Sequence, residues 1–134
     1  MKILCEKIDM VIAADNLLWS RQGPVLDIEL WEGGRRQKIH LSRIGTTYRF
    51  LSVVAGKAFV TKSARAWRDL ARRAWRKNDL KEIVTFSFDR RDRLIGVIEQ
   101  PADTLFKEEL VLYIETLARE CDRFEYQLTG QDRE

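Results

Sequence analysis

The residues able to perform acid–base or nucleophilic chemistry are few in this sequence. His40 is the only histidine, and it lies two positions before Ser42, so both side chains would share one face of a strand. A histidine general base also needs an orienting carboxylate, and no motif supplies one. We therefore interpret His40 as a partly exposed strand residue and predict no catalytic residues. An enzymatic alternative would need a deep pocket near His40 with perturbed carboxylates.

Metal and cofactor sites are also not predicted. The two cysteines, Cys5 and Cys121, lie far apart and form no CxxC pair, and one histidine cannot complete a zinc site with them. Gly33-Gly34 leads into a strand, so no helix N-terminus follows it to receive a phosphate. Both cysteines are expected to be free thiols, as is usual in a reducing cytoplasm.

Clustered arginines are the strongest electrostatic feature. The net charge is only +3, but residues 61–93 carry 11 basic and 5 acidic residues, whereas residues 101–134 carry 4 basic and 9 acidic ones. One face of a predicted helix carries Arg65, Arg68, Arg72 and Arg76. Such a face is typical of phosphate-backbone binding, which makes nucleic acid the alternative partner. Against it, no aromatic residue is predicted on that face, and the acidic last helix could neutralise it.

The N-terminal half is predicted to form one helix and a meander of strands. Apolar residues recur at helical spacing near residues 2–15, and period-two alternation follows. Gly33-Gly34 and Gly45-Thr46 supply tight turns between three antiparallel strands. The first extended segment is either a short edge strand or a lead-in. The expected segments are Leu17 to Arg21, Val25 to Glu32, Gln37 to Arg43 and Tyr48 to Val54.

The C-terminal half is predicted as helix, hairpin, helix. Thr61 or Ser63 can cap a helix that runs to about Asn78, with a two-stranded hairpin after it at 83–88 and 94–99. Asp103 or Thr104 can cap the last helix, which Gly130 ends. Its apolar residues have a 4-3-4-3-4 spacing suited to packing on a sheet: Leu110, Ile114, Leu117, Cys121, Phe124 and Leu128. The fold class is therefore α+β.

Four tryptophans divide into two predicted roles. Trp67 and Trp75 fall on the apolar stripe of their helix and are predicted to be core residues. Trp31 lies on the polar face of its strand, where alternation predicts exposure. With Trp19 it could form an apolar surface patch for a partner, the alternative being burial under the N-terminal helix.

Length and composition suit one domain spanning residues 1–134. No apolar run approaches the length of a membrane span, and Glu6, Lys7 and Asp9 interrupt any signal-like segment. We therefore expect a cytoplasmic protein without a membrane segment.

The element order resembles that of type III secretion chaperone-like proteins, which include the YbjN-like proteins of bacteria. The C-terminal part carries this resemblance: strand 83–88, a hairpin, strand 94–99, Pro101, then a long helix with Tyr113 and the run 120–126. The resemblance implies a non-catalytic homodimer that holds an extended segment of a client protein. It transfers no defined residue set, so Trp31 and Trp19 remain the predicted contacts.

Overall fold

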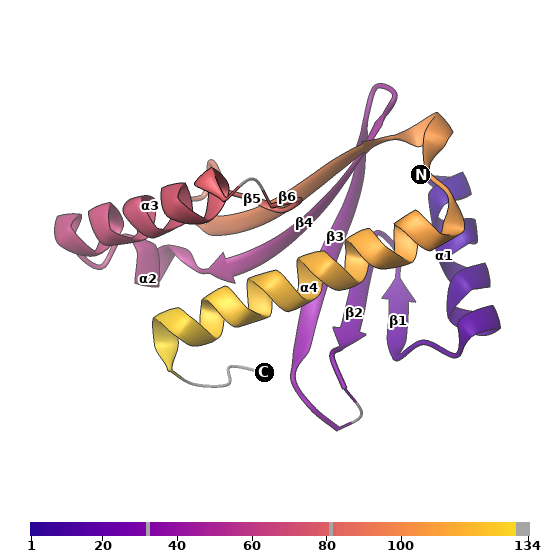
Figure 1. Cartoon of the computed structure of the whole chain (residues 1–134), viewed down its shortest axis with the longest axis horizontal. Coiled ribbons are helices and arrows are strands. Elements are labelled where there is room, and N and C mark those ends of the chain that lie inside the picture. Colours follow the sequence, from indigo (N-terminus) through magenta and orange to yellow (C-terminus); the bar gives the residue numbers. More distant parts are fainter. Residues whose placement is uncertain (32, 81, 131–134) are drawn as a thin grey trace.

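The computed structural model describes residues 1–31, 33–80 and 82–130 (Figure 1). The helices are α1 (Lys2–Asp15), α2 (Lys57–Val60), α3 (Ala64–Asp79) and α4 (Lys107–Thr129), with a 3-10 turn η1 at Ala102–Thr104. The strands are β1 (Trp19–Gln22), β2 (Val25–Glu29), β3 (Arg36–Ile44), β4 (Thr47–Ala55), β5 (Thr85–Phe88) and β6 (Leu94–Pro101). The predicted α+β class is confirmed.

All six strands form one antiparallel sheet in the order β1-β2-β3-β4-β6-β5. The predicted meander and hairpin are therefore parts of a single sheet, joined where β6 pairs with β4. The first extended segment is the short edge strand β1, paired with β2. Glu32, the predicted end of the second strand, lies outside the described residues, and β2 ends at Glu29.

Helix α4 covers one face of this sheet (Figure 1). The register places Leu41 opposite Phe50 and Phe50 opposite Ile98, so their apolar side chains share the face beneath the helix. The predicted apolar stripe of α4 meets them, with Ile114, Leu117 and Cys121 fully buried. Hydrophobic burial on this face holds the fold together.

The C-terminal end of α4 matches the prediction, and the N-terminal end does not. Gly130 adopts a left-handed φ of 66° at the C-cap, as expected of a helix-terminating glycine. Neither Asp103 nor Thr104 caps the helix, because both lie in η1 and the chain stays extended at Leu105. The helix instead begins at Lys107, with Phe106 at the N-cap.

Helices α1 and α3 lie at opposite ends of the sheet (Figure 1). Asp9 of α1 forms an ion pair with Arg21 of β1 at 2.7 Å. At the other edge, Asn78 of α3 donates to the Phe86 carbonyl of β5 and accepts from the Phe86 N–H, both at 2.8 Å. The predicted Ser63 cap begins α3, accepting from the Ala66 N–H at 3.0 Å.

The described helices are each too short or too polar to cross a membrane. Helix α2 was not predicted from the sequence. It is a single turn whose Val60 is fully buried, and it connects β4 to α3.

Candidate functional site

His40 lies on the face of the sheet opposite α4, since its strand neighbours Ile39 and Leu41 point into the core. Partial burial of the ring, and then the charges of Arg93 and Lys38, lower the pKa of His40 from its ordinary value. A hollow of about 350 Å³ beside it includes Asp27, whose carboxylate forms an ion pair with Arg36 at 3.1 Å. Within the described ranges, His40 forms no hydrogen bond with a nucleophile or a carboxylate, which a base–nucleophile pair would require.

The cysteine thiols are both free. Cys121 is fully buried, and burial raises its pKa far above the usual range, so the thiol stays protonated and serves as a core residue. Across the described ranges, no group of three His, Cys, Asp or Glu side chains could hold a metal ion.

Trp31 follows the end of β2, in the connection to β3. Trp31 is 52% exposed, as predicted, but it lies beyond the strand, so the alternation used to predict its exposure does not apply to it. One side of the indole packs on Arg35, whose guanidinium carbon lies 5.1 Å from the ring centroid. The indole lies against Gly34, where a Cβ would displace it. Trp31 is thus accessible, and it packs on Arg35 and Gly34.

Arg35 joins Trp31 to helix α4. Its guanidinium also lies 4.9 Å from the ring of Tyr126, and its Nε is 3.0 Å from the carboxylate of Asp122. Because Nε lacks aligned hydrogen-bond geometry, the contact with Asp122 is mainly a charge pair. Asp122 is only 5% exposed, so the pair is a major link between the β2–β3 connection and α4.

Trp19 does not form a surface patch with Trp31. It pairs with Ile28 on the core face of β1, and only 7% of it is exposed. The predicted contact role of Trp19 is therefore wrong, because its ring is buried in the core. Strand parity decides this, because neighbouring residues of paired strands lie on the same face.

The two tryptophans of α3 are exposed, so their predicted place in the core is wrong. Trp67 is 46% exposed and stacks on Phe88 with ring centroids 5.6 Å apart; Trp75 is 65% exposed. The helix lies along the edge of the sheet, so only Leu70 and Ala74 of its apolar stripe are buried. The sequence pattern revealed an amphipathic helix, but not how narrow its contact with the sheet would be.

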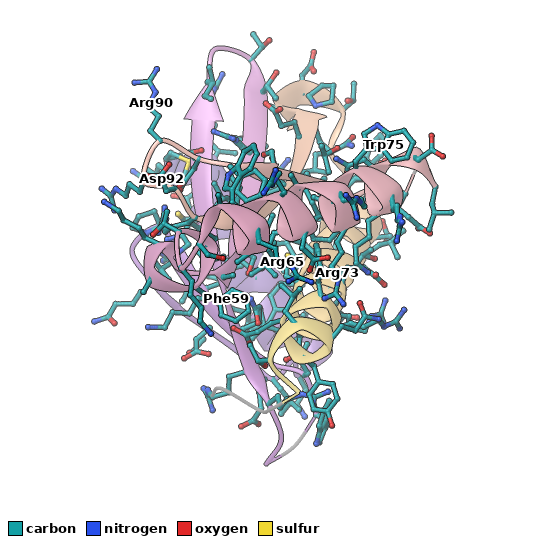
Figure 2. The ribbon with its side chains drawn as sticks, turned by 90° about the vertical axis from the view of Figure 1, so that its left-hand side faces the viewer. Phe59, Arg65, Arg73, Trp75, Arg90 and Asp92 are labelled. Carbon is teal, nitrogen blue, oxygen red and sulfur yellow. The ribbon has the colours of Figure 1, made fainter. Side chains whose placement is uncertain are left out.

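The predicted basic face of α3 is exposed at all four positions: Arg65, Arg68, Arg72 and Arg76. In Figure 2, Trp75 and Arg73 extend from opposite sides of the helix. Helical spacing puts Trp75 one turn after Arg72 and two turns after Arg68. The expectation that no aromatic residue borders this face is therefore wrong.

A hollow of about 450 Å³ continues this basic face onto the end of α4. Lys77 lies over Phe124 there, with Nζ 4.6 Å from the ring centroid. The lining side chains include three cations and no carboxylate: Arg73, Arg76, Lys77, Phe124 and Gln127.

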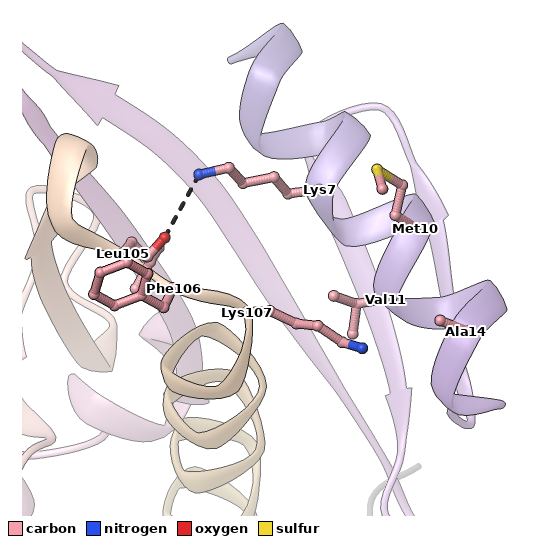
Figure 3. A pocket seen from close by; sticks show the side chains of 7 residues that line it. All are labelled: Lys7, Met10, Val11, Ala14, Leu105, Phe106 and Lys107. Carbon is pink, nitrogen blue, oxygen red and sulfur yellow. Dashed lines mark hydrogen bonds between the residues drawn. The ribbon is translucent and has the colours of Figure 1, made fainter.

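An apolar cavity of about 280 Å³ between α1 and the start of α4 was missed from the sequence (Figure 3). Met10 and Phe106 border it and are 71% and 68% exposed. Lys7 donates from Nζ to the Leu105 carbonyl at 3.5 Å. The remaining lining residues are Val11, Ala14 and Lys107. Phe106 could have indicated this cavity from the sequence. It is a large apolar residue that precedes the apolar stripe of the last helix and does not belong to that stripe.

No protein-family model and no curated protein matches the chain. Solved structures do match. The crystal structure of the ExsC–ExsE complex contains a chain with a TM-score of 0.53 and 14% identity, covering 78% of this chain and 75% of that one. YbjN from E. coli, described as a candidate transcription regulator, has a TM-score of 0.58 and 13% identity, covering 92% and 87%.

The chain therefore has the type III secretion chaperone-like fold that YbjN shares, as the resemblance predicted. At these identities the likeness establishes the fold alone.

Proposed function

We propose that this protein is a non-catalytic, chaperone-like module that binds an extended apolar segment of a client protein, acting as a cytoplasmic homodimer. The cavity between α1 and α4 carries the proposal, because Met10 and Phe106 leave large apolar surfaces exposed beside it. Exposed apolar surface of this kind marks contacts with other proteins.

The cavity can accept an apolar side chain. Its volume of about 280 Å³ is near the lower end of the range of ligand pockets, and Met10, Val11 and Phe106 line it. It suits one large apolar side chain of a longer segment. The flexible thioether of Met10 can adapt to different side chains, which fits recognition of more than one sequence.

The sheet edges favour the same mode of binding. On the edge strand β5, the side chain of Asn78 hydrogen-bonds the N–H and the carbonyl of Phe86. The opposite edge strand, β1, has only four residues, and its Arg21 forms an ion pair with Asp9 of α1. Short or covered edges resist the addition of another strand. A client would therefore be held mainly through side chains, over the cavity and the exposed ring of Trp31.

The comparisons support a protein partner by analogy only. One similar structure is a complex of two proteins, which shows that this fold can be found in such an assembly. The homodimer, the absence of catalysis and the cytoplasmic location follow from the resemblance to chaperone-like proteins.

The test measures how strongly the purified protein binds to each member of an array of random peptides. Wild type should prefer peptides with large apolar residues. Met10→Asp combined with Phe106→Asp should lower binding about tenfold or more, since each charge would have to be buried in the contact. Leu112→Asp is the matched control, because Leu112 is 52% exposed on α4 but does not line the cavity.

Equal binding by the double variant and wild type would refute the cavity as the site, and no peptide binding at all would refute the function. Trp31→Ala tests the second contact on the same array. Light scattering across a dilution series tests the homodimer, which should have about twice the 15.8 kDa mass of one chain.

A further inference from the structure

Helix α3 presents an unusual concentration of positive charge to solvent. Its 16 residues include six cations, Arg65, Arg68, Arg72, Arg73, Arg76 and Lys77, against two aspartates. In this fully described helix, the only ion pair joins Arg73 to Asp69, at 3.6 Å. Arg68, Arg72 and Arg76 succeed one another by four residues, so they rise about 6 Å at each step along one face. Among the residues that the structure describes, no carboxylate forms an ion pair with Arg65, Arg68, Arg72 or Arg76.

Two features on either side of this face point to the same kind of ligand. On one side, Trp75 offers a 65% exposed indole next to Arg68 and Arg72. On the other side, the hollow at Arg73 and Lys77 is lined by donors and an aromatic ring, with no carboxylate. Such a surface fits a ligand that carries several negative charges and at least one flat, stackable group.

We propose that α3 binds single-stranded nucleic acid. Its phosphates lie along Arg68, Arg72 and Arg76 and reach the hollow at Arg73, while an unpaired base stacks on Trp75. Guanidinium groups bind phosphate oxygens two at a time, as they do carboxylates. A nucleic-acid backbone supplies such anions in a regular series, which suits arginines that follow one another along a helix. Stacking on Trp75 needs a base free of its partner, which favours a single strand over a duplex.

This site is separate from the cavity of the proposed peptide site. The cavity at Met10 belongs to α1 and the start of α4, whereas α3 lies at the opposite end of the sheet (Figure 1). Variants at one end should therefore leave the other activity intact, so the two proposals can fail independently.

The test uses fluorescence anisotropy with a labelled mixed-sequence DNA strand of about 16 nucleotides, the upper end of the site sizes of small domains. Four phosphate contacts predict that log K falls against log salt with a slope of about −3. Arg68→Gln with Arg72→Gln should weaken binding and halve that slope. Arg119→Gln with Arg123→Gln removes the same charge from the exposed side of α4 and should change binding little.

Trp75→Ala tests the stacking, and it should weaken single-strand binding about tenfold while leaving the salt slope unchanged. Because Trp75 is mostly exposed, circular dichroism should show an unaltered fold. Met10→Asp with Phe106→Asp should bind DNA as wild type does.

Several outcomes would overturn the proposal. The first is a protein that does not bind DNA at low salt, and the second is an Arg119→Gln, Arg123→Gln control that loses as much binding as the α3 variant. The third such outcome is a Trp75→Ala variant that binds as tightly as wild type. Tighter binding of the duplex of the same sequence would exclude the single strand as the ligand. Competition by polyglutamate at the same charge concentration would assign the surface to acidic polypeptides instead.

Discussion

The two halves of helix α4 differ in how they meet the rest of the molecule. The C-terminal half is closely packed: Cys121 lies against Gly96, and Phe124 meets Phe86 edge to face with centroids 4.9 Å apart. The start of the helix, at Lys107, borders the cavity of about 280 Å³ beside the exposed Phe106, whereas Leu110, Ile114 and Leu117 further along are buried. One helix thus supplies both closely packed core contacts and the rim of an open apolar surface.

This difference shows how a small domain can combine a stable fold with an adaptable surface. Close packing gives a rigid structure, whereas exposed apolar residues contribute little to stability and remain available to a partner. We therefore expect substitutions near the C-terminal half to unfold the protein and substitutions near the cavity to spare the fold.

Asp122→Ala should lower stability by about 3 kcal/mol, because it leaves the Arg35 guanidinium, which packs between two aromatic rings, without this charge partner. Urea unfolding measures this change. The control is Glu120→Ala, whose partly exposed pair with Arg123 at 3.7 Å should contribute less than about 1 kcal/mol. Similar losses for both variants would contradict the importance of the buried pair.

Gly96→Ala should cost about 1–3 kcal/mol through overpacking. The added methyl would meet Cys121 Sγ too closely and Val84 Cγ1 at 3.1 Å. Cys121→Ala should therefore destabilise the wild type but cost less, or even restore stability, in the Gly96→Ala background; additive losses would contradict the steric explanation. Gly56→Ala is the control, because a Cβ there meets nothing within 4 Å.

Asn78→Ala should cost about 1–2 kcal/mol, since two hydrogen bonds to the Phe86 backbone are lost and its polar groups remain partly buried. It should also free the edge of β5 for pairing with other chains. Sedimentation velocity at rising concentration would detect that association. Asp79→Ala, the exposed neighbour at the end of α3, should leave stability and association almost unchanged. An Asn78→Ala variant as stable as wild type would show that Asn78 does not protect the edge.

Much of the fold could be predicted from local patterns. The spacing from Leu110 to Phe124 predicted the buried face of α4, and the glycine turns predicted the meander, because both signals depend on neighbours in sequence. The pairing of β4 with β6 could not be predicted, since it joins segments separated by α3 and depends on long-range packing.

The candidate surfaces were harder to predict for the same reason. Trp19 and Trp31 both fall in segments with strand-like alternation, and alternation alone does not say which face of a strand is buried. Only the pairing of Trp19 with Ile28 shows that Trp19 points into the core. Trp67 and Trp75 occupy an apolar stripe that is wider than the contact α3 makes at the sheet edge. Helical periodicity gives the direction of a side chain relative to its helix, and tertiary packing decides how much of that face is covered.

Met10→Gln should have the smallest effect, a change in stability within about 0.5 kcal/mol, because Met10 is mostly exposed and only borders the cavity. Ile8→Ala in the same helix is the contrast: Ile8 is fully buried, so its truncation should cost about 2–5 kcal/mol. Urea unfolding of both variants compares the two directly. If Met10→Gln lowered stability as much as Ile8→Ala, Met10 would be a core packing residue. The cavity end of α4 would then contribute to stability as the packed end does. If Met10→Gln is neutral, any loss of peptide binding in Met10 variants reports on contact with the client.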